Sequence, residues 1–179
     1  DANTLAMVQT YREAIHCETL REQVFKGQKA PLLFGEPETW LALLIEALLR
    51  EGRGEHDAAA RLREQAFEQA PASPGQAQGD GEPVAFQWIA DADMRIGPVL
   101  EAVVNGRYYW IPFSRLAAVT IEAPTDLRDR VWMPAHLTLA NGGEVVALLP
   151  TRYAGSDLSD PLAMKPKPLA SLNHLTVPI

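Results

Sequence analysis

Two carboxylates and a guanidinium lie close together in the segment Asp91-Ala-Asp93-Met-Arg95. Paired carboxylates can bind a divalent cation or divide acid and base roles if further ligands join them. A hydrolase-like or metal-binding site would therefore need Asp91, Asp93 and Arg95 to converge with His136 around a pocket. The pattern favours a plainer interpretation, a polar turn whose aspartates cap backbone amides and pair with Arg95.

The residue pattern gives little support for a zinc site, a nucleophilic serine or a phosphate-binding loop. The four histidines occur singly, without the H-x-x-x-H or H-E-x-x-H spacing of zinc sites. His136 is interpreted as a hydrogen-bonded structural residue. No G-x-S-x-G elbow is present, and Gly142-Gly143 lies in a predicted hairpin turn, not before a helix. The sequence predicts no catalytic residue, no metal and no cofactor.

The most distinctive stretch is the aromatic run Tyr108-Tyr109-Trp110, which follows Asn105-Gly106. Consecutive strand residues point to opposite faces, so each face of the sheet receives at least one large aromatic ring. One face can be core, and the other either packs on the helical half or is offered to a protein partner. Burial of Tyr108, Tyr109 and Trp110 distinguishes these interpretations.

Helical spacing dominates the first seventy residues. It predicts a helix over residues 4–25, a second from about Pro37 to the Gly52-x-Gly54 break, and a third over 55–69. The first is expected to bury an apolar stripe: Leu5, Val8, Tyr11, Ile15, Leu20 and Val24. The second and third have the size of one tetratricopeptide-type hairpin, with small residues at Ala59 and Ala66 and a closing Pro71.

In the second half of the chain, the spacing of apolar residues changes from helical to alternating. Small and polar residues over 72–83 predict a linker, and alternating patterns over 84–156 predict a small, mainly antiparallel β domain of five or six strands in a curled sheet or partial barrel. Asn105-Gly106 predicts a type I′ hairpin, and 140–143 predict another. Thr125 is predicted to cap a short helical turn. With a helical segment over 1–71, the fold class is α+β.

The composition excludes several classes of partner. The net charge is −7 and no Lys/Arg cluster occurs, which argues against nucleic acid and anionic membranes. No stretch approaches 18 uninterrupted apolar residues and no secretory leader is evident, so a cytoplasmic protein is expected. The single cysteine, Cys17, is predicted to be a small buried thiol in a reducing compartment.

Six ordered segments resemble one known family, the ImpE family, also called SciE or TagJ, of accessory proteins in bacterial type VI secretion systems. The resemblance extends over residues 7–156. Its segments are 7–15, 34–44, 88–101, 105–113, 126–135 and 140–156.

The resemblance implies a non-enzymatic adaptor with a tetratricopeptide-like N-terminal part. Its implied partner is the small subunit of the contractile sheath, bound through that subunit's N-terminal helix, with a link to sheath handling by the ClpV disaggregase. Residues of the family motifs are candidates for an interaction or structural role: Trp40, Asp91, Asp93, Arg95, Tyr108, Tyr109, Trp110, Trp132, Asn141 and Arg152.

Both ends depart from the family pattern. The chain begins at Asp1 inside a predicted helix, where family members carry more helical sequence, so a trimmed start is expected. Residues 161–179 do not match the expected family ending, and they make up most of the segment 157–179. This segment is predicted to form an irregular tail without a site.

Overall fold

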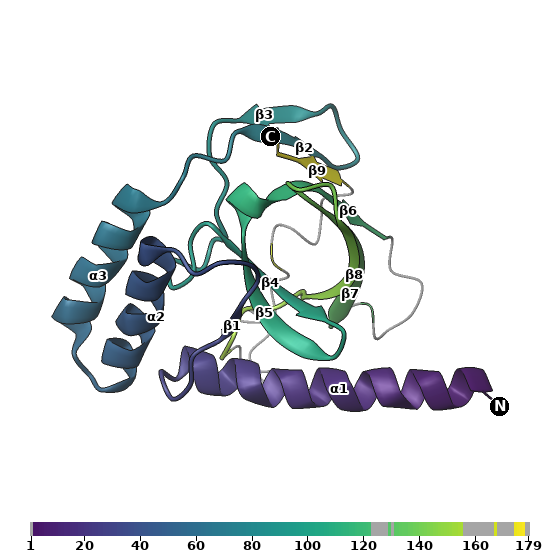
Figure 1. Ribbon diagram of the computed structural model, residues 1–179, viewed down its shortest axis with the longest axis horizontal. Coiled ribbons are helices and arrows are strands. Elements are labelled where there is room, and N and C mark those ends of the chain that lie inside the picture. The colour runs from purple at the N-terminus through teal and green to yellow at the C-terminus, as the bar shows by residue number, and fades with distance from the viewer. Residues whose placement is uncertain (1, 123–128, 130, 156–166, 168–173, 178–179) are drawn as a thin grey trace.

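The structure is a computed structural model that describes residues 2–122, 129, 131–155, 167 and 174–177 (Figure 1), with the backbone alone for residues 2–7, 10 and 11. Its helices are α1 (Ala2–Phe25), α2 (Thr39–Gly52), α3 (His56–Gln69) and the 3-10 helix η1 (Phe113–Arg115). Its strands are β1 (Leu32–Leu33), β2 (Gly75–Gln78), β3 (Val84–Phe86), β4 (Val99–Val104), β5 (Arg107–Pro112), β6 (Leu116–Ile121), β7 (Trp132–Leu139), β8 (Glu144–Pro150) and β9 (His174–Thr176).

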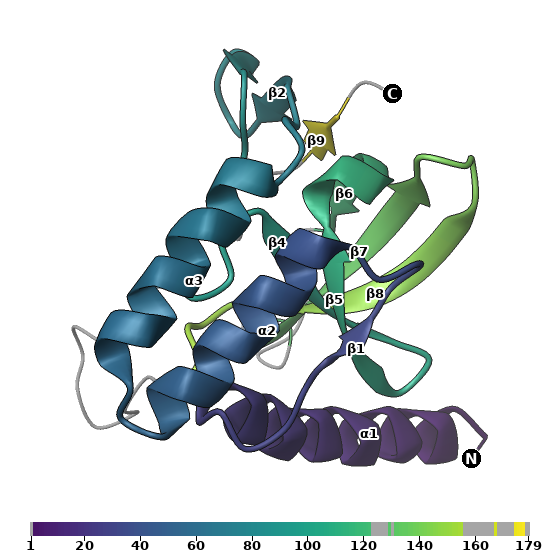
Figure 2. The same cartoon turned by 60° about the vertical axis from the view of Figure 1, so that its left-hand side comes forward.

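The described strands form one sheet in the order β1-β5-β4-β8-β7-β6-β9-β2-β3. All pairs are antiparallel except β1 with β5. The sheet curls around its own interior, α1 crosses one side, and α2 and α3 lie together on another (Figures 1 and 2). The α+β class and the curled sheet predicted from the sequence are confirmed.

Strand alternation divides the apolar residues into two cores. Along β4, Leu100, Ala102 and Val104 point into the curled sheet, where they join a cluster from β5 to β9. Val99 and Val103 point outward to the helices. Both faces of β4 are therefore buried, and the acidic residue between the two valines, Glu101, is only 1% exposed.

The helix α1 buries only part of the stripe expected from its sequence, since Val24 is buried and Leu20 is half-buried. Val8 and Ile15 are 40% and 68% exposed, and the side chains of Leu5 and Tyr11 lie outside the described residues. Beside Val24, the buried face carries residues outside that stripe, namely Ala14, Cys17, Arg21 and Phe25. Small residues let the helix approach the sheet closely, and Arg21 meets an internal carboxylate described below.

The pair α2 and α3 matches the predicted hairpin closely. The helix α2 begins at Thr39, two residues after the expected Pro37, and Gly54 closes the turn with a φ of +78°. Ala59 and Ala66 are fully buried. The tetratricopeptide-like character of this pair stays a prediction.

Both predicted β-hairpins form. Asn105 and Gly106 have φ values of 49° and 70°, which gives the two left-handed residues that a type I′ turn requires, between β4 and β5. The second hairpin joins β7 to β8 and uses Gly142 at a φ of +83°. The predicted Thr125 cap lies outside the described residues.

Three boundaries drawn from the sequence are wrong. The segment 72–83 contains β2, the segment 1–71 contributes β1 to the sheet, and the segment 157–179 contributes β9, which lies between β6 and β2. The sheet thereby exceeds the five or six strands predicted. Gly75 lets β2 pair closely with β9, because a side chain at this position would collide with the carbonyl oxygen of Thr176 on β9.

Candidate functional site

The turn that carries Asp91, Asp93 and Arg95 holds itself together. The Asp91 carboxylate accepts a hydrogen bond from the backbone amide of Asp93 at 2.9 Å, and Asp93 accepts one from the amide of Arg95 at 3.0 Å. The Arg95 guanidinium pairs with Asp93 at 2.6 Å and donates to the carbonyl oxygen of Ala154 at 3.0 Å. This is the capped polar turn that the sequence favoured.

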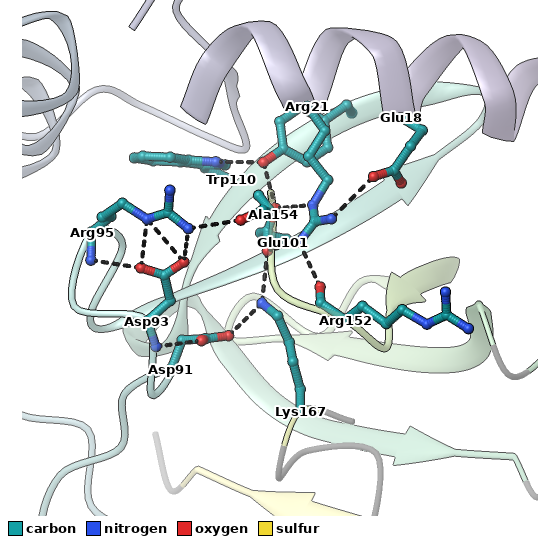
Figure 3. A network of polar contacts seen from close by, with 11 residues as sticks. Glu18, Arg21, Asp91, Asp93, Arg95, Glu101, Trp110, Arg152, Ala154 and Lys167 are labelled. Carbon is teal, nitrogen blue, oxygen red and sulfur yellow. Dashed lines mark hydrogen bonds and ion pairs between the residues drawn. The ribbon is translucent and has the colours of Figure 1, made fainter. Parts of the chain in front are cut away.

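A buried ion cluster lies beside this turn, between α1 and the sheet (Figure 3). Glu101 on β4 is its centre. Arg21 on α1 donates to both carboxylate oxygens, at 2.6 and 3.0 Å, and Lys167 donates to Oε2 at 2.7 Å. The fourth member is Asp91, whose Oδ2 accepts from Lys167 at 2.7 Å. Two cations therefore balance two anions.

The cluster joins segments that are far apart in the sequence. The backbone amide of Lys167 donates to the carbonyl oxygen of Thr151 at 2.7 Å, and Arg21 donates to the carbonyl oxygen of Arg152 at 2.7 Å. One carboxylate, Glu101, is thus bound by both α1 and a residue of the predicted irregular tail. The expectation that no site involves that tail is wrong for Lys167.

The aromatic strand supplies the rest of the polar network. The Tyr108 hydroxyl donates to Glu101 at 2.7 Å and accepts from the indole nitrogen of Trp110 at 2.9 Å. Both rings are fully buried against the helices. Tyr109 points to the other face and contacts Phe34 edge-on at 5.4 Å between ring centroids. Because Tyr108 and Trp110 are buried, their rings belong to the core and not to an exposed partner surface.

The cluster shifts the pKa values of its members. Burial alone would raise the pKa of Glu101, but Arg21 and Lys167 lower it to about 2. Burial would lower the pKa of Arg21 and of Lys167, but the nearby carboxylates raise both. Burial, with the charge of Glu101, raises the pKa of Tyr108 well above its usual value. The network is thus ionised but internally neutral.

Acid is expected to weaken the fold through Glu101. Its folded pKa of about 2 lies below the unfolded value of about 4.3, so its contribution is present above pH 4.3 and is lost as the pH falls toward 2. Urea unfolding of the wild type between pH 6 and pH 2 should show a steeper loss of stability than that of Glu101→Gln. Equal slopes for the two proteins would contradict this role.

The geometry does not favour the enzyme alternative. His136 on β7 is exposed and hydrogen bonds Glu122 at 2.8 Å, so its partner is not the turn that carries Asp91 and Asp93. No group of three or more His, Cys, Asp and Glu side chains in the described part of the chain could hold a metal ion. Of the four residues proposed for a catalytic site, Asp93 and Arg95 pair with each other, Asp91 pairs with Lys167, and His136 pairs with Glu122.

The remaining family-motif residues occupy different places. Trp40 is buried on α2 and donates to Glu38 at 2.8 Å, and Trp132 is buried on β7. Asn141 caps its hairpin turn by accepting from the amide of Gly143 at 3.0 Å. Arg152 takes part in the cluster through its backbone carbonyl, and its side chain points elsewhere.

The centre of the cluster, Glu101, was not predicted from the sequence. Glu101 carried one signal, since it is an acidic residue inside the apolar run Val99–Val104, and a charge in such a strand needs a buried partner. Arg21 lies outside the apolar stripe predicted for its helix. The place of Lys167 could not be predicted, because nothing in its local sequence indicates that it contacts Asp91 and Glu101.

Cys17 is buried against the hairpin turn, and its thiol lies 3.4 Å from the carbonyl oxygen of Gly106. Burial, with the charges of Glu13 and Glu18, raises the pKa of the thiol to about 11. This agrees with the small buried thiol predicted from the sequence.

Alkylation of Cys17 is expected to be slow in the folded protein. At pH 8 a pKa of about 11 leaves so little thiolate that labelling by iodoacetamide should be at least about 100-fold slower than in urea. Mass spectrometry over time measures the two rates. Similar rates in the folded and unfolded chain would show that α1 does not stay docked.

Comparisons with known proteins concern the family and the fold of the chain. Residues 83–166 match the model of the family described as ImpE protein. The chain is also 57% identical over 154 residues to the type VI secretion system accessory component TagJ of Pseudomonas aeruginosa PAO1. The chain belongs to the ImpE family, as the sequence resemblance predicted.

The extent of these matches differs. The aligned part of TagJ covers 86% of this chain and 53% of TagJ, so the chain spans about half the length of that curated relative. A crystal structure of protein VPA1032 from Vibrio parahaemolyticus has a TM-score of 0.84, with 98% of this chain and 75% of that chain covered. At 20% identity, this likeness concerns the fold.

Proposed function

We propose that the protein is a non-enzymatic accessory component of a bacterial type VI secretion system, acting as a cytoplasmic adaptor. The observation that carries the proposal is the 57% identity to TagJ, which is named as an accessory component of that system. Its partner is the small subunit of the contractile sheath, and through this subunit the protein takes part in ClpV-dependent sheath handling.

The internal use of polar groups supports an adaptor over an enzyme. The carboxylates of Asp91, Asp93 and Glu101 each form ion pairs within the protein. A general acid or base must exchange protons with a bound substrate, and a carboxylate held ionised between buried cations is poorly suited to that exchange. The same groups are well suited to keeping α1 and the sheet in one arrangement.

The helices and the surface charge support a protein partner. A tetratricopeptide-like pair, α2 and α3, is a common element of surfaces that bind peptide helices. A net charge of −7 favours encounter with basic partner surfaces. No described helix has the length and apolar character needed to cross a membrane.

Co-purification tests the proposal. The full-length protein and a tagged small sheath subunit from the same organism are co-expressed and passed over an affinity column and then a sizing column. We expect the two chains to elute together, and ClpV to be recovered only when the sheath subunit is present. Separate elution of the two chains at micromolar concentration would contradict the proposed partner.

A further inference from the structure

Arg152 differs from the other charged residues of the family motifs. Its backbone carbonyl accepts a hydrogen bond from Arg21 at 2.7 Å, which fixes the position of the residue. Its guanidinium makes no hydrogen bond or ion pair with any residue that the structure describes, and it points away from the ion cluster (Figure 3). The charges of Asp91, Asp93 and Arg95 are compensated inside the protein, whereas Arg152 has no such partner among the described residues.

Arg152 borders a small cleft of about 210 Å³ between α1 and the segment that follows β8. Apolar groups contribute to its lining, including Val131, whose side chain is 42% exposed. The wall from α1 is polar. The residues that line the cleft include Glu18, Arg21, Glu22, Val131, Arg152 and Tyr153.

The charges around the cleft select one kind of occupant. Arg21 already forms ion pairs with Glu101 and with Glu18, the latter at 3.2 Å. Glu22 lies 3.6 Å from Lys26. Arg152 is thus the charge at the cleft that lacks a partner among the described residues. A guanidinium binds carboxylates through paired, charge-assisted hydrogen bonds, which strengthen when the contact is shielded from water.

We propose that this cleft docks a segment of a protein partner in which an acidic side chain binds Arg152 and a neighbouring apolar side chain covers Val131 and Tyr153. The apolar contact excludes water from the ion pair, and the ion pair sets the register of the segment. The proposal rests on the proposed function, because the partner that carries the segment is the small sheath subunit.

Charge reversal on both sides tests the docking site. Calorimetry compares the wild type, Arg152→Glu and Val131→Asp, each titrated with the small sheath subunit. Arg152→Glu should weaken binding at least about tenfold, and Val131→Asp should also weaken it. Each acidic residue of the partner segment is then changed to lysine in turn, and one of these changes should restore binding to Arg152→Glu.

The matched control is Arg107→Glu, the same charge change at an exposed position at the start of β5. It should bind like the wild type, and circular dichroism confirms the folding of every variant. Unchanged binding by Arg152→Glu, or loss of binding that no partner reversal restores, overturns the docking site and leaves the proposed function standing. Absence of binding by the wild type overturns the proposed function itself, and the docking site with it.

Discussion

Replacing Glu101 with glutamine is expected to lower the free energy of unfolding by about 3–5 kcal/mol. Glutamine has nearly the same shape, so packing is retained, but it cannot neutralise Arg21 and Lys167. These cations are only 2% and 4% exposed, so water cannot replace the lost carboxylate charge. Urea unfolding at neutral pH, followed by circular dichroism, measures the change.

Glu144→Gln provides the control for this substitution. Glu144 is an exposed carboxylate on β8, and its loss should change the free energy of unfolding by no more than about 0.5 kcal/mol. A similar small effect for Glu101→Gln would show that the ion cluster contributes little to stability. The acid-dependent difference between wild type and Glu101→Gln should then disappear as well.

Replacing Lys167 with methionine is expected to cost about 2–4 kcal/mol. Methionine keeps most of the apolar stem but removes the ammonium group that binds Asp91 and Glu101, each at 2.7 Å. Glu101 keeps Arg21, so the loss should be smaller than for Glu101→Gln, while Asp91 loses its ion-pair partner. Urea unfolding measures this change in the same way.

The control for Lys167 is Lys29→Met, at an exposed position after α1. This change should be nearly neutral. Alkylation of Cys17 adds a second readout, because α1 keeps its own contact to Glu101 through Arg21 and should stay docked in Lys167→Met. A neutral effect of Lys167→Met would mean that Lys167 does not stabilise the fold through the ion cluster.

Local sequence signals predicted the parts of the fold that depend on local physics. Helical period located α2 and α3, and the positive φ angles available to Asn105-Gly106 predicted the turn between β4 and β5. The capped turn around Asp93 also followed from short-range geometry, since its hydrogen bonds span two residues. Short-range patterns of this kind are set by the residues involved and their immediate neighbours.

The parts that were wrong depend on pairing across long stretches of chain. The position of β9 between β6 and β2 is fixed by partners about 55 and 100 residues away, which no local pattern specifies. The buried face of α1 was missed for a related reason. Val24 follows the apolar period of the helix, but Arg21 is buried because it pairs with the distant carboxylate of Glu101.

The candidate site changed most between sequence and structure. The residues that suggested catalysis, Asp91 and Asp93, are held by Lys167 and Arg95, and His136 pairs with Glu122. The residue types alone suggested a catalytic or metal-binding site. The structure shows that these charges form ion pairs within the protein. What remains available to a partner is the surface, including the guanidinium of Arg152.

Calorimetric titration of the small sheath subunit into the full-length protein is the most direct test of the central claim that this protein is a secretion-system adaptor. The account predicts saturable binding with one sheath subunit per protein and no dependence on added metal or nucleotide. Absence of binding at concentrations well above micromolar, with both proteins folded, would contradict it.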